Sequence, residues 1–200
     1  MRLALLIILT ALLTAGQPDL SLGQVQLNPA QRSLIIPAVV NQQEGIVEFL
    51  LVHQSGKVHE AVFSTAVPAV ELAASLALLG LQADPTDHQH PQDLLADLHD
   101  HPAVHLHYSL DAGRSWLPAS QLVSYTGAGA PLPTQPWRFT GSYFYRGTYM
   151  AQVEGDLVAI HTRAHALLNL AHADRDDDTR WHAQGSATKG DQALLRFTAP

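Results

Sequence analysis

Histidine side chains, which can coordinate metals, are concentrated in one part of this 200-residue sequence. Six of the twelve histidines fall in the stretch HQHPQDLLADLHDHPAVHLH, from position 88 to position 107. They form three His-x-His pairs: His88 with His90, His99 with His101, and His105 with His107. Because imidazole is a common ligand of zinc, copper and nickel, the stretch raises the hypothesis of a metal site that holds Zn, Cu or Ni.

The three pairs lie in different local contexts. His105 and His107 belong to a segment that alternates between apolar and polar residues, which predicts a half-buried strand. Since residues two apart on a strand share a face, both imidazoles are expected on its polar face. The other pairs lie in a His-, Asp- and Pro-rich loop predicted at 82–102, with little apolar content to support a preorganised site. Three interpretations stay open: a physiological metal site, weak incidental metal binding, and polar loop residues that bind nothing.

A second candidate site centres on the motif GKVHE, which contains Lys57, His59 and Glu60. The runs IVEFLLV (46–52) and KVHEAVFST (57–65) flank a Ser-Gly turn, which predicts a hairpin of two central strands. This register places Glu60 opposite Leu51 on an apolar face, where a carboxylate must be paired, hydrogen-bonded or neutral. We therefore consider two roles for Glu60: a satisfied structural carboxylate, or a polar group in a ligand groove formed with Lys57 and His59.

Motifs for catalysis and cofactor binding are not completed in the sequence. The acidic run after 173 has Thr179 and Gly185 where a calcium loop needs glycine and glutamate. Gly127 and Gly129 lack the third glycine and the following helix of a dinucleotide site. No acid, base and nucleophile can be assembled by spacing. We predict no catalytic residue and favour a protein that is not an enzyme.

The elements that would position these side chains are mostly strands. One segment, about 68–80, starts at a proline, carries Ala and Leu at helical density and ends at Gly80, which predicts one principal buried helix. Strands are expected at about 28–43, 104–110, 137–161 and 192–200, a short helical turn at 166–170, and loops at 127–136 and 174–178. The predicted class is α+β, mostly antiparallel β, in a single domain over 24–200.

The first residues predict export. MRLALLIILTALLTAG has a positive Arg2, an apolar run and small residues at its end, the pattern of a secretory signal peptide within 1–23. The apolar run is shorter than the roughly 20 residues of a membrane-spanning helix. Cleavage after Gly16 and cleavage after Gly23 both satisfy the small-residue preference. We expect a periplasmic or secreted protein without a stable membrane anchor after cleavage.

Composition narrows the partners of such a protein. It has no cysteine and therefore no disulfide, and its net charge of −7 disfavours nucleic acids and anionic membranes. We therefore predict an exported cell-envelope binding or accessory module, whose partner is an envelope protein or a small ligand. The alternative is a periplasmic metal-binding protein that uses the stretch from His88 to His107.

Two resemblances add to these predictions. The series VEFLLV, GKVHE, LAASLALLGL, FTGSYF and ALLNL resembles the YdjY-like domain, a family of exported bacterial proteins of unestablished function, from about Leu34 to Pro200. This resemblance implies a location and a fold but no catalytic residues. The stretch SLDAGRSW, from Ser109 to Trp116, is similar to the Asp-box hairpin of sialidase-type propellers. A single copy cannot build a propeller, so it implies only a structural turn held by its aspartate, glycine and tryptophan.

Overall fold

The computed structural model describes residues 20–83, 95–96, 98–126, 137–172, 179–185 and 187–200. The segment 1–19, His88 and His90, the loop expected at 127–136 and the acidic run at 174–178 lie outside the described residues.

Eight strands close into a barrel. Around the barrel they follow the order β3 (Ser33–Val40), β15 (Gln192–Thr198), β6 (Ala103–Ser109), β9 (Trp137–Phe139), β13 (Leu168–Leu170), β12 (Asp156–Ala159), β4 (Phe49–His53) and β5 (Ala61–Thr65). Pairing of β5 with β3, through Val39 opposite Ser64 and Val40 opposite Phe63, closes the ring.

The barrel is mixed in direction. Six of its neighbouring pairs are antiparallel, whereas β12 with β13 and β4 with β5 are parallel. The prediction of a largely β fold is therefore confirmed, but the strands are not antiparallel throughout. The main core consists of wholly buried apolar side chains from the barrel strands, among them Ile36, Leu51, Phe63, Leu195 and Phe197.

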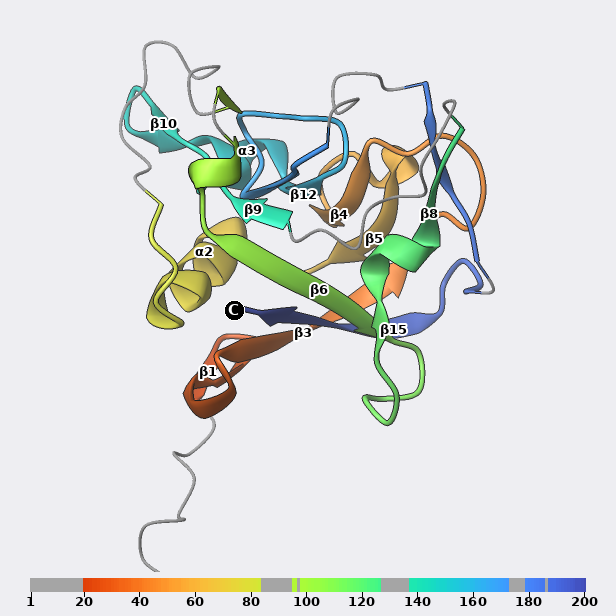
Figure 1. The fold of residues 1–200 in the computed structure, drawn as a ribbon, viewed down its shortest axis with the longest axis horizontal. Helices are drawn as coiled ribbons and strands as arrows, with labels where there is room; N and C mark the ends of the chain where they lie inside the picture. The colour runs from red at the N-terminus through yellow and green to blue at the C-terminus, as the bar shows by residue number, and fades with distance from the viewer. Residues whose placement is uncertain (1–19, 84–94, 97, 127–136, 173–178, 186) are drawn as a thin grey trace, which may run out of the picture.

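Short elements extend this barrel (Figure 1). The strand β2 (Val25–Asn28) continues the sheet beside β3, β1 (Leu20–Leu22) pairs with β2, and β7 (Leu117–Pro118) pairs with β6. Two separate ribbons are formed by β10 (Phe144–Tyr145) with β11 (Thr148–Tyr149) and by β8 (Val123–Tyr125) with β14 (Trp181–Ala183). In Figure 1, β10 and the main helix lie at the left and β8 at the right. Single 3₁₀ turns occur at Pro29–Gln31, Val58–Glu60, Leu98–Asp100 and Ala119–Leu122.

The predicted helix is present as α2 (Ala69–Leu78), followed by Gly80 in the left-handed region at φ 85°. Its burial differs from the prediction. One face, including Leu72 and Leu76, is wholly buried, but the side chains of Val70 and Leu78 are 48% and 65% exposed. The helix therefore covers the sheet from outside and is not enclosed between two layers. A second helix, α3 (Met150–Glu154), interrupts the region 137–161, where only strands were predicted, so the prediction is wrong for these residues.

The predicted hairpin is wrong. Residues 58–60 form a 3₁₀ turn, η3, that brings the chain back, so that β5 starts beside the start of β4 and runs parallel to it. Leu51 consequently lies opposite Phe63 and not opposite Glu60. Both strands are buried on both faces, as expected for central strands. This burial removes the alternation that would have fixed their direction and register.

Other local predictions had mixed outcomes. The predicted strands are found at β3, β6 and β15. The helical turn expected at 166–170 is wrong, because Leu168–Leu170 is the barrel strand β13. No helix among the described residues has the length and apolar character needed to cross a membrane.

Candidate functional site

Charged side chains from separate segments meet in an open depression of about 460 Å³, which we call the charged groove. The residues that line it are Glu48, Lys57, His59, Glu60, Glu154, Asp156, Arg163 and His165. The structure thus brings together Lys57, His59 and Glu60, the three residues of the predicted ligand groove, although the strand register used to predict them was wrong. Their role in ligand binding stays a prediction.

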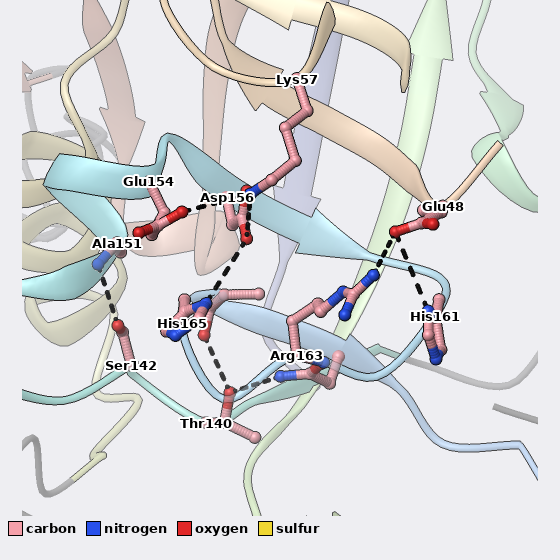
Figure 2. Close-up of polar contacts among 12 residues, drawn as sticks. Glu48, Lys57, Thr140, Ser142, Ala151, Glu154, Asp156, His161, Arg163 and His165 are labelled. Carbon is pink, nitrogen blue, oxygen red and sulfur yellow. Dashed lines mark hydrogen bonds and ion pairs between the residues drawn. The ribbon is translucent and has the colours of Figure 1, made fainter. Parts of the chain in front are cut away.

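An ion pair between Asp156 and Lys57 forms the floor of the groove (Figure 2). Asp156 opens β12 and its side chain is wholly buried. Lys57 Nζ lies 3.0 Å and 3.2 Å from the two carboxylate oxygens of Asp156 and 3.4 Å from Oε2 of Glu154. Nζ of Lys57 also lies 5.4 Å from the ring centroid of Phe49, and Phe49 belongs to a small apolar cluster that is separate from the main core. A charged pair therefore rests against an apolar surface.

The environment shifts the pKa of both partners. Burial raises the pKa of the Asp156 carboxyl, although its hydrogen bond and attraction to Lys57 act in the opposite direction. For Lys57, burial lowers the pKa, but the hydrogen bonds and charges of Asp156 and Glu154 outweigh this effect and raise it overall. Lys57 is therefore held as a cation, which makes it unsuitable as a nucleophile at neutral pH.

A second ionic contact lies at the other end of the β4–β12 pair. Glu48 precedes β4, and its backbone oxygen accepts hydrogen bonds from Ile160 and His161 just after β12. The guanidinium of Arg163 donates to Oε2 of Glu48, and Nδ1 of His161 lies 3.8 Å from the same oxygen. In Figure 2 this contact lies to the right of the Lys57–Asp156 pair.

Glu60 and His59 lie on η3, at the rim of the groove. His59 Nε2 is 3.4 Å from Oε1 of Glu60, and the two side chains are 77% and 36% exposed. The expectation that Glu60 projects from the apolar face of a strand is therefore wrong, because residue 60 ends a 3₁₀ turn. The buried carboxylate of this region is Asp156.

A buried hydrogen-bond network positions Arg163 and His165. Asn169, wholly buried on β13, donates from Nδ2 to Oγ1 of Thr140 at 2.9 Å and accepts from the backbone N–H of Arg163 at 2.8 Å. The Thr140 hydroxyl in turn donates to the carbonyl oxygens at 166 and 167. The loop is thereby fixed so that Nδ1 of His165 lies 4.0 Å from Asp156.

The helix α3 carries Glu154 to the groove. The Ser142 hydroxyl accepts a hydrogen bond from the N–H of Ala151 at the first turn of this helix. The helix ends at Gly155, which has φ 74° and packs closely against Gly56 in the turn before Lys57. A Cβ atom at Gly155 would lie 3.0 Å from the Cα of Gly56. Two glycines therefore set the approach of Lys57 to Glu154 and Asp156.

The predicted metal ligands do not converge in the described part of the chain. Arg138 binds the carbonyl oxygen of His101 at 3.2 Å and lies 3.5 Å from Nδ1 of His99. His105 and His107 share the polar face of β6 as predicted, with Arg196 on the neighbouring strand beside His107. Burial, the charge of Arg196 and that of His105 lower the pKa of His107. Among the described residues no three His, Asp or Glu side chains form a group that could hold a metal.

The Asp-box-like stretch forms the turn that its residues predict. Asp111 accepts hydrogen bonds from the N–H and the hydroxyl of Ser115 at 2.9 Å and 2.6 Å, and it lies 2.7 Å from the Ser109 hydroxyl. These contacts lower the pKa of Asp111, the hydrogen bond from the Ser115 side chain most of all. Gly113 has φ 85°, and Trp116 stacks on Arg196 at 4.4 Å. The stretch therefore stabilises a turn outside the charged groove.

A larger hollow of about 700 Å³ lies between α2 and β10–β11, lined by Val70, Ala73, Ala74, Ala77, Leu81, Gln82, Ala83, Phe139, Gly141, Phe144 and Tyr149. None of these residues is charged. The Tyr149 hydroxyl already donates a hydrogen bond to the carbonyl oxygen of Gly141 at 2.7 Å. The hollow thus offers few groups that could orient a ligand, whereas the charged groove offers eight.

Sequence reasoning missed Glu48, Glu154, Asp156, Arg163 and His165. Only one of them carried a usable signal: Asp156 opens the apolar run DLVAI, which forms a wholly buried barrel strand. A carboxylate at such a position needs a partner, and Lys57 lies 99 positions away.

The chain matches no family model, and neither curated proteins nor solved structures give a match. The resemblance to the YdjY-like domain therefore stays a prediction, and a functional assignment rests on the geometry of the site.

Proposed function

We propose that this chain is an exported cell-envelope binding module whose charged groove holds a small ligand. The observation that carries this proposal is the wholly buried Asp156, paired with Lys57 at the floor of an open depression. A buried ion pair adds little to stability compared with apolar residues of similar size. Groups with shifted pKa values in a concave site are typical of functional sites.

The composition of the groove favours binding over catalysis. Its lining consists of carboxylates, histidines, one lysine and one arginine, without a hydroxyl or thiol among the described residues. Lys57 is held between Asp156 and Glu154, and Arg163 is held by Glu48. These side chains can recognise charge and shape, and Lys57, held as a cation, is not available as a nucleophile.

Export is the second part of the proposal. The pattern of residues 2–16 supports a secretory signal, and the domain is stabilised without cysteine. The acidic net charge disfavours nucleic acids as partners. We therefore propose that the protein lies in the periplasm or outside the cell, where it binds a small ligand or an envelope protein. The resemblance of its sequence motifs further supports membership of the YdjY-like domain family.

An NMR ligand screen tests the binding function. The exported chain, labelled with ¹⁵N, is titrated with separate pools of cationic, anionic and neutral small molecules. We expect at least one pool to shift the amide signals of residues 57–60 and 154–165 together. Shifts that are confined to other surfaces, or no shifts with any pool, would refute the groove as a ligand site.

A further inference from the structure

We propose that the ligand of the charged groove is an organic cation that carries a primary amine or guanidinium group. This inference rests on the proposed function, because it names the class of ligand for the same site.

The balance of charge in the groove is the first argument. Four carboxylates, those of Glu48, Glu60, Glu154 and Asp156, face two permanent cations, Lys57 and Arg163. With neutral histidines the groove therefore has two net negative charges. A concave site lined by an excess of one sign of charge raises the local concentration of the opposite charge, so the groove attracts cations.

The carboxylates of the groove have hydrogen-bond acceptors left for a ligand. Both cations are committed: Lys57 contacts Asp156 and Glu154, and Arg163 contacts Glu48. Among the described residues, the contacts of Glu48 and Glu154 use only their Oε2 atoms, and Glu60 pairs only with the exposed His59. Carboxylate oxygens are thus free to accept hydrogen bonds from a cation, whereas an anion would be repelled by the excess of carboxylates in the groove.

The spacing of the side chains in the groove favours an organic cation over a bare metal ion. Metal coordination needs several ligand atoms at short, fixed distances from one point. The described residues contain no group of three His, Asp or Glu side chains arranged in that way. Ammonium and guanidinium groups carry several N–H donors and form charge-assisted hydrogen bonds with carboxylates that are spread along a groove.

Isothermal titration calorimetry of the exported chain tests the class of ligand. The probes are putrescine and L-arginine amide, with citrate as the anionic arm and glucose as the neutral arm. We expect a cationic probe to bind in a 1:1 ratio and to bind more weakly as salt is added. Glu60→Gln and Glu154→Gln should each weaken binding about tenfold, the equivalent of one charge-assisted hydrogen bond. Both side chains are partly exposed, so the variants should fold, which thermal melting verifies.

The matched control is Glu44→Gln, which removes the same charge from an exposed position outside the groove. It should leave the affinity for the cationic probe within about twofold, because Glu44 does not line the groove and the charge of an exposed side chain is screened by water and salt. An equal loss in Glu44→Gln would mean that the probe responds to overall charge, and would overturn the inference.

The outcomes also separate this inference from the proposed function. Binding of citrate or glucose that is weakened by the groove variants, together with no binding of putrescine or L-arginine amide, would show that the groove is a binding site whose ligand is not a cation. If no probe binds and the NMR screen also fails, both proposals are refuted.

Discussion

Asp156 is the residue of the charged groove whose ionised side chain is most strongly disfavoured by its surroundings. Its carboxylate is wholly buried and depends on Lys57, the nearby Glu154 repels it, and His165 lies 4.0 Å away. Desolvation of a carboxylate favours its protonated form, which is the physical reason that its pKa is raised. The groove therefore contains a group whose ionisation couples the stability of the fold to pH.

The variant Asp156→Asn tests this coupling. Because the pKa of Asp156 is higher in the folded state, the native protein binds the proton more tightly than the unfolded chain. Its contribution to the free energy of unfolding is then complete below the ordinary aspartate value of 3.8 and decreases as pH rises through the folded pKa. The raised pKa of Lys57 has no effect in this range, since its ordinary value is 10.5.

Urea unfolding of both proteins at a series of pH values measures the effect. The free energy of unfolding of the wild type, minus that of Asp156→Asn, should decrease as pH rises from about 4 towards neutrality. A difference that increases with pH would mean that Lys57 lowers the pKa of Asp156 below its ordinary value, contrary to the direction given above.

At the scale of elements, the groove depends on the contact between the end of α3 and the turn after β4. Gly155 is in the left-handed region, and its backbone oxygen accepts from the N–H of His53 at 2.7 Å. A side chain at 155 would add backbone strain and would also press on Gly56. The glycine thus fixes the distance between Lys57 and the carboxylates of Glu154 and Asp156.

We expect Gly155→Ala to lower the free energy of unfolding by about 2–3 kcal/mol, from the left-handed conformation and the backbone contact together. The control is Gly147→Ala in the β10–β11 turn, which has φ 78° but open space around the position. It should cost only about 1 kcal/mol, from backbone conformation alone. Chemical denaturation of the two variants compares them, and equal losses would show that the contact with Gly56 does not matter.

The elements also show what the sequence could predict. Strands with one polar face, such as β6, and the proline-to-glycine segment of α2 were located because their patterns are periodic or bounded. The direction of β5 and the strand β13 were missed, since segments that are buried on both faces show no alternation of apolar and polar residues. The strand β13 pairs with β9 and β12, and these pairings depend on how the whole barrel closes.

The same limit applies to the candidate site. Lys57, His59 and Glu60 could be predicted together because they lie within four consecutive positions of the sequence. Asp156 and Arg163 join them only through the pairing of β12 with β4. Local patterns carry no information on such long-range pairing, so five of the eight residues that line the groove were missed.

At the scale of the whole molecule, the structure bears on where the proposed signal peptide would be cleaved. The strand β1 pairs with β2 in register, with Leu20 opposite Leu27 and Leu22 opposite Val25, and Leu22 packs against the main core. Cleavage after Gly16 would keep this strand, whereas cleavage after Gly23 would remove it. We therefore expect the exported protein to begin at Gln17, which intact-mass spectrometry of the periplasmic or secreted fraction determines. A start at Gln24, or an intact Met1, would contradict this expectation.

The central claim is that the charged groove holds a small cationic ligand in the exported protein. Native mass spectrometry of protein released gently from its own envelope, without added ligand, tests this claim most directly. We predict a population of the wild type with one small, amine- or guanidinium-containing molecule bound, present also in Glu44→Gln and strongly reduced in Glu60→Gln. Ligand-free protein in every sample, or a bound molecule that is retained equally in Glu60→Gln, would contradict the account.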